Sequence, residues 1–198
     1  LEQAVRQGAA WLAQGLAMPI AINVSALQFQ QPQFIERVAA ALQASGLPPH
    51  LLELELTESI LVRDADEALQ RLQALARIGV RLAIDDFGTG YSSLAYLKRF
   101  PIDKLKIDRS FIQGLPDDDS DRAIVVAILQ LAAALGKKVI AEGVETESQR
   151  QFLLDSGCHE FQGFLFAPAL DSLSFVSRLR QPDAPAAARA PRMRLVSG

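Results

Sequence analysis

The chain has 198 residues, of which 49% are hydrophobic and 22% charged, and its 20 basic and 23 acidic side chains give a net charge of −3 at pH 7. This length and composition are typical of one globular domain; they exclude wholesale disorder and lack the positive charge of a DNA-binding surface. The single cysteine, Cys158, excludes an internal disulfide bond and a cysteine-rich zinc site.

No stretch of the sequence predicts a membrane span or a secretory signal. The longest strongly apolar run, Ala123–Gly136, is interrupted by Gln130 and is shorter than the roughly 20 residues that a span needs. The first residues lack the basic segment that precedes the apolar part of a signal peptide. We therefore expect a cytoplasmic location. This expectation includes the case in which the chain is part of a larger, membrane-attached protein.

Short apolar runs alternate with longer amphipathic segments along the chain. Runs of strand length are expected at 20–24, 51–57, 80–84, 103–107, 138–141 and 160–166. Helical spacing, with glycine or proline at several ends, predicts helices over 34–45, 64–78, 92–99, 122–135, 147–155 and 172–179. The last residues are rich in Ala, Pro and Arg, so we expect a domain over 1–178 and a flexible tail over 179–198.

This alternation of strand and helix predicts an α/β fold with a parallel sheet. Two architectures fit the pattern, an open doubly wound sheet and a closed (β/α)8 barrel. No G-x-G-x-x-G segment follows the first expected strand, which weakens the dinucleotide-binding version of the open sheet.

Polar side chains recur where the expected strands end, or late within them. These residues are Asn23, Glu55, Asp85, Asp86, Lys106, Glu142 and Gln162. The carboxyl ends of parallel strands meet on one face of the fold, so the side chains are expected to converge there. Clustered carboxylates suit Mg²⁺ or Mn²⁺, and a pair of such ions with a nearby lysine suits the hydrolysis of a phosphodiester.

Each of these residues also fits a structural role. The leucine–glutamate alternation of 51–57 fits an edge strand with one exposed face. The pair Asp85–Asp86 fits turn chemistry before a glycine-rich segment, and Lys106 is placed to pair with Asp103 or Asp108. The recurrence of polar groups at several separate strand ends favours the functional interpretation.

Six segments resemble motifs of the EAL-domain family and follow in the family's order. They are Ile22–Ser25, Leu54–Ser59, Ile84–Leu94, Leu105–Asp108, Ala141–Thr146 and Gln162–Phe164. The resemblance implies a (β/α)8-like barrel with one strand reversed. It also implies hydrolysis of cyclic di-GMP to linear pGpG with Mg²⁺ or Mn²⁺, in bacterial second-messenger signalling.

The resemblance also assigns roles to individual residues. The implied metal ligands of a two-metal site are Asn23, Glu55, Asp85 and Asp86, with Asp85 as the bridge. Lys106 would contact the attacking water or the phosphate, Glu142 would act as a metal-site acid or base, and Gln162 would position the water. Glu145 would support the site, and Glu58 would hold the glycine-rich loop that follows Asp86.

The family carries the Glu-Ala-Leu motif that names it on an early strand well before the Asn-Val-Ser segment, and no such motif precedes Asn23 in this sequence. The metal-binding glutamate and the substrate-contacting arginine that accompany that motif are missing with it. A typical complete barrel has about 250 residues, and this sequence is shorter. We therefore expect a partial barrel of about six strand–helix units whose first strands are missing, with impaired turnover by this fragment. The alternative is a non-catalytic module that binds cyclic di-GMP or dimerises.

The resemblance implies three partners besides the metal ions. They are cyclic di-GMP, a second copy of the chain near the loop Asp85–Leu94, and an upstream sensory or GGDEF-type domain.

Overall fold

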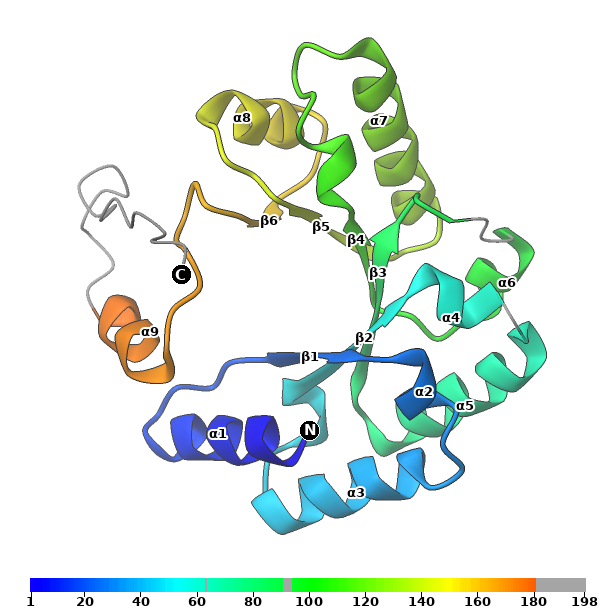
Figure 1. The fold of residues 1–198 in the computed structure, drawn as a ribbon, viewed down its shortest axis with the longest axis vertical. Coiled ribbons are helices and arrows are strands. Elements are labelled where there is room, and N and C mark those ends of the chain that lie inside the picture. The colour runs from blue at the N-terminus through cyan, green and yellow to red at the C-terminus, as the bar shows by residue number, and fades with distance from the viewer. Residues whose placement is uncertain (63, 91–93, 181–198) are drawn as a thin grey trace, which may run out of the picture.

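The computed structural model describes residues 1–62, 64–90 and 94–180. In this part of the chain one sheet of six parallel strands runs in chain order from one edge to the other. The strands are β1 (Ile20–Val24), β2 (Leu52–Thr57), β3 (Arg81–Phe87), β4 (Lys104–Ile107), β5 (Lys138–Glu142) and β6 (Glu160–Gln162). The sheet curls around an open centre, as Figure 1 shows. The reversed strand that the family resemblance implies is not among these six.

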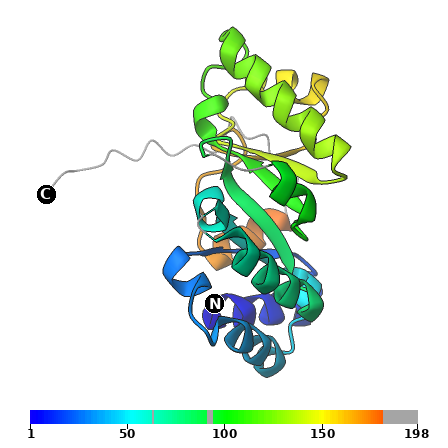
Figure 2. The ribbon, with the colours of Figure 1, turned by 90° about the vertical axis from the view of Figure 1, so that its right-hand side faces the viewer.

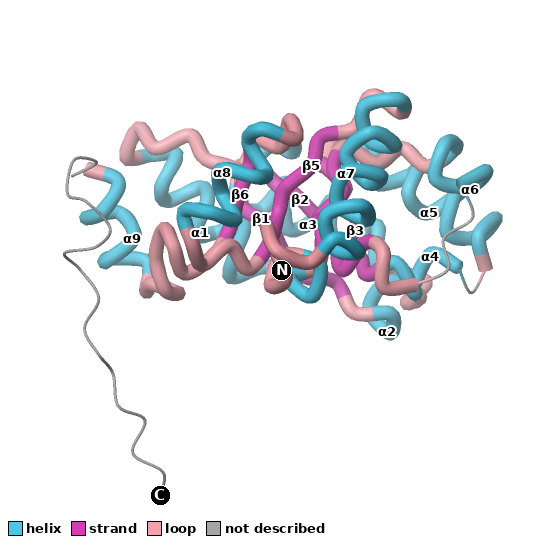
Figure 3. Tube along the Cα trace, turned by 90° about the horizontal axis from the view of Figure 1, so that it is seen from above, coloured by secondary structure: helices cyan, strands magenta, loops and turns pink. Residues whose placement is uncertain are grey.

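The helices lie on the outer side of the curled sheet. They are α1 (Glu2–Ala13), α2 (Ala26–Phe29), α3 (Phe34–Ser45), α4 (Glu58–Val62), α5 (Ala65–Ile78), α6 (Leu94–Arg99), α7 (Asp119–Ala134), α8 (Glu147–Asp155) and α9 (Ser172–Leu179), with single 3-10 turns at Pro49–Leu51 and Arg109–Phe111. In side view α5 and α7 cross the outer face of the strands (Figure 2), and from above the strands lie between the helices (Figure 3). This arrangement is a partial barrel and not an open doubly wound sheet, because the latter carries helices on both faces.

Local sequence signals explain where several helices begin and end. Ser25 and Thr146 form capping boxes with the third residues of α2 and α8. The helix α3 ends at Gly46 and α5 at Gly79, both with positive φ, as the glycine positions predicted. The helix α7 begins three residues earlier than expected because the Asp118 side chain accepts from the backbone N–H groups of its first turn.

Strand β2 shows why the alternation of leucine and glutamate is not that of an edge strand. It pairs with β1 on one side and β3 on the other, and Leu52–Leu56 is buried throughout. Because successive side chains point to opposite faces, the leucines pack in the hydrophobic core while Glu53 and Glu55 face the interior of the barrel. The exposed edge-strand interpretation is therefore wrong.

Some expected boundaries also differ. Strand β3 extends through Asp85 and Asp86 to Phe87, whereas the expected strand stopped before both acids. Strand β6 ends at Gln162, whereas the expected strand ran to Phe166. The next residue, Gly163, approaches the turn after β5 so closely that a Cβ there would be 2.1 Å from the carbonyl oxygen of Val144. The periodic pattern did not predict α1, α2 and α4, two of which have only four or five residues.

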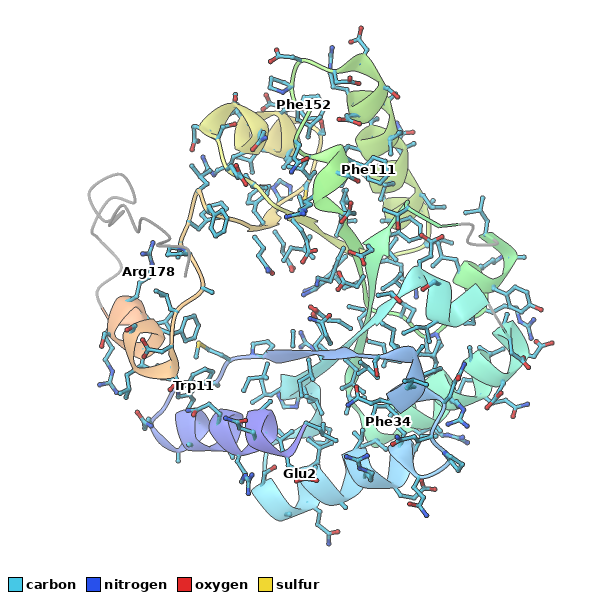
Figure 4. The ribbon with its side chains drawn as sticks, in the orientation of Figure 1. Glu2, Trp11, Phe34, Phe111, Phe152 and Arg178 are labelled. Carbon is cyan, nitrogen blue, oxygen red and sulfur yellow. The ribbon has the colours of Figure 1, made fainter. Side chains whose placement is uncertain are left out.

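The first and last of the described helices lie side by side at the opening of the curled sheet, with α1 beside β1 and α9 in the gap between β1 and β6 (Figure 1). Trp11 extends from α1 towards α9 (Figure 4), where its ring centroid is 5.3 Å from that of Phe175. Helix α9 ends at Leu179, and residues 181–198, most of the expected tail, lie outside the described residues. No helix in the described part of the chain is long and apolar enough to cross a membrane.

Candidate active site

A buried lysine is the centre of the candidate site. Lys106, in the middle of β4, is 4% exposed. Its Nζ lies 2.7 Å from Oε2 of Glu55, 2.8 Å from Oδ1 of Asp85 and 2.9 Å from Oε1 of Glu142. One ammonium group therefore connects β2, β3 and β5 across the interior of the barrel. Lys106 does not pair with Asp103 or Asp108 in this arrangement.

The electrostatics of this cluster balance burial against ion pairing. Burial lowers the pKa of Lys106, but hydrogen bonds to the three carboxylates outweigh it, so its pKa lies above the ordinary value. Burial raises the pKa of Glu55 and of Glu142, repulsion from Asp85 adds to the rise, and the bond to Lys106 opposes it. The ammonium thus stays charged, and the two glutamates hold a proton more readily than ordinary carboxylates do.

A local distortion of β3 brings two adjacent acids to one site. In a regular strand Asp85 and Asp86 would point to opposite faces of the sheet. Here the pairing of β3 with β4 shifts register between Ile84 and Phe87, and Asp86 has a φ of 53°, in the left-handed region. Bulges and strained backbone of this kind occur beside functional sites, where they redirect side chains.

As a result, three carboxylates converge. Single oxygens of Asp85, Asp86 and Glu142 all lie within 4.8 Å of one another. Burial, Asp85 and Asp108 raise the pKa of Asp86, in that order. Three oxygen donors of this kind suit a hard divalent cation, which would relieve the repulsion between them.

The remaining expected ligands and catalytic residues border the same region. Asn23 is exposed near the end of β1, in register with Glu55, and Gln162 is in register with Glu142 at the end of β6. Gln162 and Glu145 line a pocket of about 830 Å³ together with Asp86 and Glu142.

Glu58 occupies a different position, beneath the glycine-rich turn that follows β3. Its buried Oε2 accepts from the backbone N–H groups of Gly88 at 3.0 Å and Gly90 at 3.2 Å. The carboxylate therefore holds the turn directly after Asp86, as the resemblance implied. Residues 91–93 of the expected dimerisation loop lie outside the described residues.

Sequence reasoning missed several residues of the pocket. Asp108 lies two residues after Lys106 and lines the pocket; burial raises its pKa, but the hydrogen bonds from Ser110 outweigh this, so the pKa is lowered. Its place at the end of β4 was the signal that could have identified it. The lining also includes Phe164, Phe175 and Arg178, which come from the segment after β6 and from α9 and carry no strand-end signal.

Comparison with known proteins agrees with this fold. The family model described as EAL domain matches residues 1–169. The chain belongs to the EAL domain family. The bifunctional diguanylate cyclase/cyclic di-GMP phosphodiesterase MucR of Pseudomonas aeruginosa is 52% identical over 166 residues, which are 83% of this chain and 24% of MucR. This EAL chain spans about a quarter of the length of the relatives it matches.

Solved EAL structures superpose closely on the chain. The MucR phosphodiesterase in complex with cyclic di-GMP has a TM-score of 0.86 at 48% identity, covering 88% of this chain and 71% of that one. The EAL domain of Mycobacterium smegmatis DcpA has a TM-score of 0.88 at 40% identity, covering 93% and 83%. A manganese/cyclic di-GMP complex of Klebsiella pneumoniae BlrP1 has a TM-score of 0.76 at 33% identity, covering 84% and 42%.

Proposed function

We propose that this chain forms the catalytic part of a phosphodiesterase that hydrolyses cyclic di-GMP to linear pGpG. The convergence of the Asp85, Asp86 and Glu142 carboxylates beside the Lys106 ammonium carries this proposal. The names of MucR and of its complex with cyclic di-GMP support the choice of substrate.

The donor atoms fit a site for two divalent cations, Mg²⁺ or Mn²⁺. Asn23, Glu55, Asp85 and Asp86 would hold the ions. All four offer oxygen atoms, which these cations prefer, and the manganese complex of BlrP1 supports the assignment. Ions bound there supply an activated water and stabilise the charge that develops on the phosphate.

The side chains of the chain perform the remaining steps. The Lys106 ammonium donates to a phosphate oxygen or to the attacking water. Glu142 accepts a proton from that water, a role favoured by a pKa that burial raises above the ordinary value of a carboxyl group. Gln162 orients the water from the neighbouring strand, and Glu145 supports the site from the same pocket.

The pocket has the size and the mixed lining that a cyclic dinucleotide requires. Its volume of about 830 Å³ lies in the range of small-molecule sites, roughly 300–1,000 Å³. Besides the acids, the lining includes Phe164, Phe175 and Arg178, which offer aromatic faces and a cation to a base or phosphate.

The wider assembly is part of the proposal. The turn that Glu58 holds is the start of a contact between two copies of the chain, and a sensory or GGDEF-type domain precedes this region in the whole protein. Size-exclusion chromatography with light scattering tests the dimer: a monomer at every concentration up to about 100 µM would refute it.

Cleavage of cyclic di-GMP, followed by chromatographic detection of pGpG with Mg²⁺ or Mn²⁺ present, tests the function. Glu55→Gln should lower the rate at least about a hundredfold, since even the outer partners of metal ligands cost ten- to hundredfold. Glu53→Gln is the matched control two residues earlier on the same strand, and it should retain the rate within about threefold. Tight binding of cyclic di-GMP by the wild type without any cleavage would refute the proposal in favour of a binding module.

A further inference from the structure

The turn between β5 and α8 carries two of the acids that line the pocket. Glu142 ends β5 and contacts Lys106, and Glu145 follows three residues later. The pairing of β5 with β6 reaches Glu142 and goes no further. Contacts outside the strand ladder therefore determine where the rest of the turn lies.

Gln149, in the first turn of α8, holds this turn from one side. Its side chain is buried, and its Oε1 accepts from the backbone N–H groups of Glu145 at 2.8 Å and Thr146 at 3.0 Å. Its Nε2 donates to the carbonyl oxygen of Ile112 at 3.1 Å. Ile112 is fully buried in the segment that follows β4, the strand of Lys106. One amide thus joins the turn after β5 to the segment after β4.

The end of β6 holds the other side of the turn. The Val144 N–H donates to the carbonyl of Gln162, and the Val144 carbonyl accepts from the N–H of Leu165, each at 3.0 Å. Gly163 lies so close to Val144 that it has no room for a Cβ. The turn therefore lies between backbone contacts on one side and the Gln149 side chain on the other.

Helix capping accounts for only part of what Gln149 does. Gln28 has the same place in α2, and its Oε1 accepts from the N–H of Ser25 at 3.1 Å in the same kind of capping box. Gln28 is exposed, whereas Gln149 is buried, accepts from a second N–H and reaches a distant carbonyl. A capping box requires none of these three features.

We propose that Gln149 is a positioning residue for the reaction, whose amide fixes the β5–α8 turn so that Glu142 and Glu145 face the substrate. The inference rests on the proposed hydrolysis of cyclic di-GMP. A displacement of a reacting group by about 1 Å can cost roughly a hundredfold in rate. Loss of the amide therefore lowers kcat, while KM changes little because the substitution leaves Phe164, Phe175 and Arg178 in the pocket lining.

The test compares Gln149→Leu with Gln151→Leu in the protein, by cleavage kinetics with Mn²⁺ and by hydrogen exchange of the amides of residues 143–149. Gln151 lies on the same helix, is exposed and bonds only to Asp155 among the described side chains, so its replacement is the matched control. For Gln149→Leu we expect kcat to fall about ten- to a hundredfold with KM within threefold, and the amides of Glu145 and Thr146 to exchange faster. Gln151→Leu should match the wild type in both measurements.

A kcat within twofold of the wild type for Gln149→Leu would overturn the proposal. The proposal is also overturned if kcat falls only in proportion to the folded fraction of the variant. It is overturned as well if kcat falls while the amides of Glu145 and Thr146 keep their protection from exchange. A wild type that does not cleave cyclic di-GMP contradicts the proposed function instead, which keeps the two failures distinct.

Gln149→Glu serves if the leucine variant does not fold, because it keeps an acceptor for both N–H groups, although it replaces the donor to Ile112 by a charged oxygen. It should keep kcat within about fivefold and protect both amides. Loss of more than tenfold with both amides protected would refute the role of the acceptor.

Discussion

Replacing Lys106 by methionine tests whether its ammonium balances the buried acids. The substitution retains a long, flexible stem and removes the charge that contacts Glu55, Asp85 and Glu142 at 2.7–2.9 Å. Removing one partner of a buried ion pair costs about 3–5 kcal/mol, because it leaves an uncompensated charge. With three carboxylates left, we expect the free energy of unfolding to fall by about 4–5 kcal/mol at pH 7.5 without divalent ions. Urea unfolding followed by far-UV circular dichroism measures the difference.

The pH dependence of this deficit has a defined sign. Burial raises the folded-state pKa of Glu55 and Glu142, and loss of the ammonium raises both further. A carboxyl group with a raised folded-state pKa contributes stability below its unfolded pKa of about 4.3, and this is lost as the pH rises through the folded value. The deficit of the variant relative to the wild type should therefore shrink as the pH falls from about 7.5 to about 5.

Lys104→Met is the matched control on the same strand. Lys104 contacts Glu53 at 3.1 Å and Glu160 at 3.3 Å, and the side chain of Glu160 is 41% exposed. Solvent can compensate Glu160, so only the buried Glu53 is left without a partner, and we expect a smaller loss of about 3 kcal/mol. Mn²⁺ should reduce the deficit of Lys106→Met, by supplying positive charge to its acids, and leave that of Lys104→Met unchanged. A Lys106→Met deficit below about 1 kcal/mol at pH 7.5, or one that grows on acidification, would refute the reasoning.

Three further substitutions test separate contacts. Glu58→Ala leaves two backbone N–H groups of the Gly88–Gly90 turn without their carboxylate, so we expect a loss of about 2–3 kcal/mol in stability. We also expect weaker Mn²⁺ binding by calorimetry, and unchanged Mn²⁺ affinity would contradict the link to Asp86. Gly163→Ala places a Cβ against the carbonyl of Val144 and should cost about 1–3 kcal/mol by thermal unfolding, whereas a wild-type melting temperature would show that the turn can shift freely. Burial raises the pKa of Cys158 from 9.0 to about 11, so its stabilising contribution is complete below pH 9 and is lost as the pH rises towards 11. Between pH 8 and 10 the wild type should lose about 1.3 kcal/mol more stability than Cys158→Ala, and equal losses would exclude this titration.

Much of the fold follows from local signals in the sequence. The spacing of apolar residues and the stops at Gly46 and Gly79 predicted α3 and α5 almost to the residue. Those signals act over a few residues, so they do not depend on tertiary contacts. The short helices α2 and α4 have too few residues to show a period, and β6 ends just before Gly163, which closely approaches Val144, a residue 19 positions away along the chain.

The candidate site divides in the same way. The placement of polar residues at strand ends identified Lys106, Glu142 and the aspartate pair, because all parallel strands end on one face. It did not identify Gln149, whose proposed role depends on the carbonyl group of Ile112, 37 positions away. It also did not identify the aromatic residues that line the pocket, Phe164 and Phe175.

The sequence by itself determined that this chain is an α/β protein of the EAL family with its acids and lysine at the ends of parallel strands. Strand period and motif order suffice for that, because both are local or linear properties of the chain. Only the tertiary structure decided that Glu53 and Glu55 face the barrel interior and that one ammonium connects three strands. It also decided that a register shift and a left-handed Asp86 bring two adjacent carboxylates to the same site, against the alternation of a regular strand. That outcome depends on how β3 pairs with β4, and pairing between strands cannot be deduced from either strand alone.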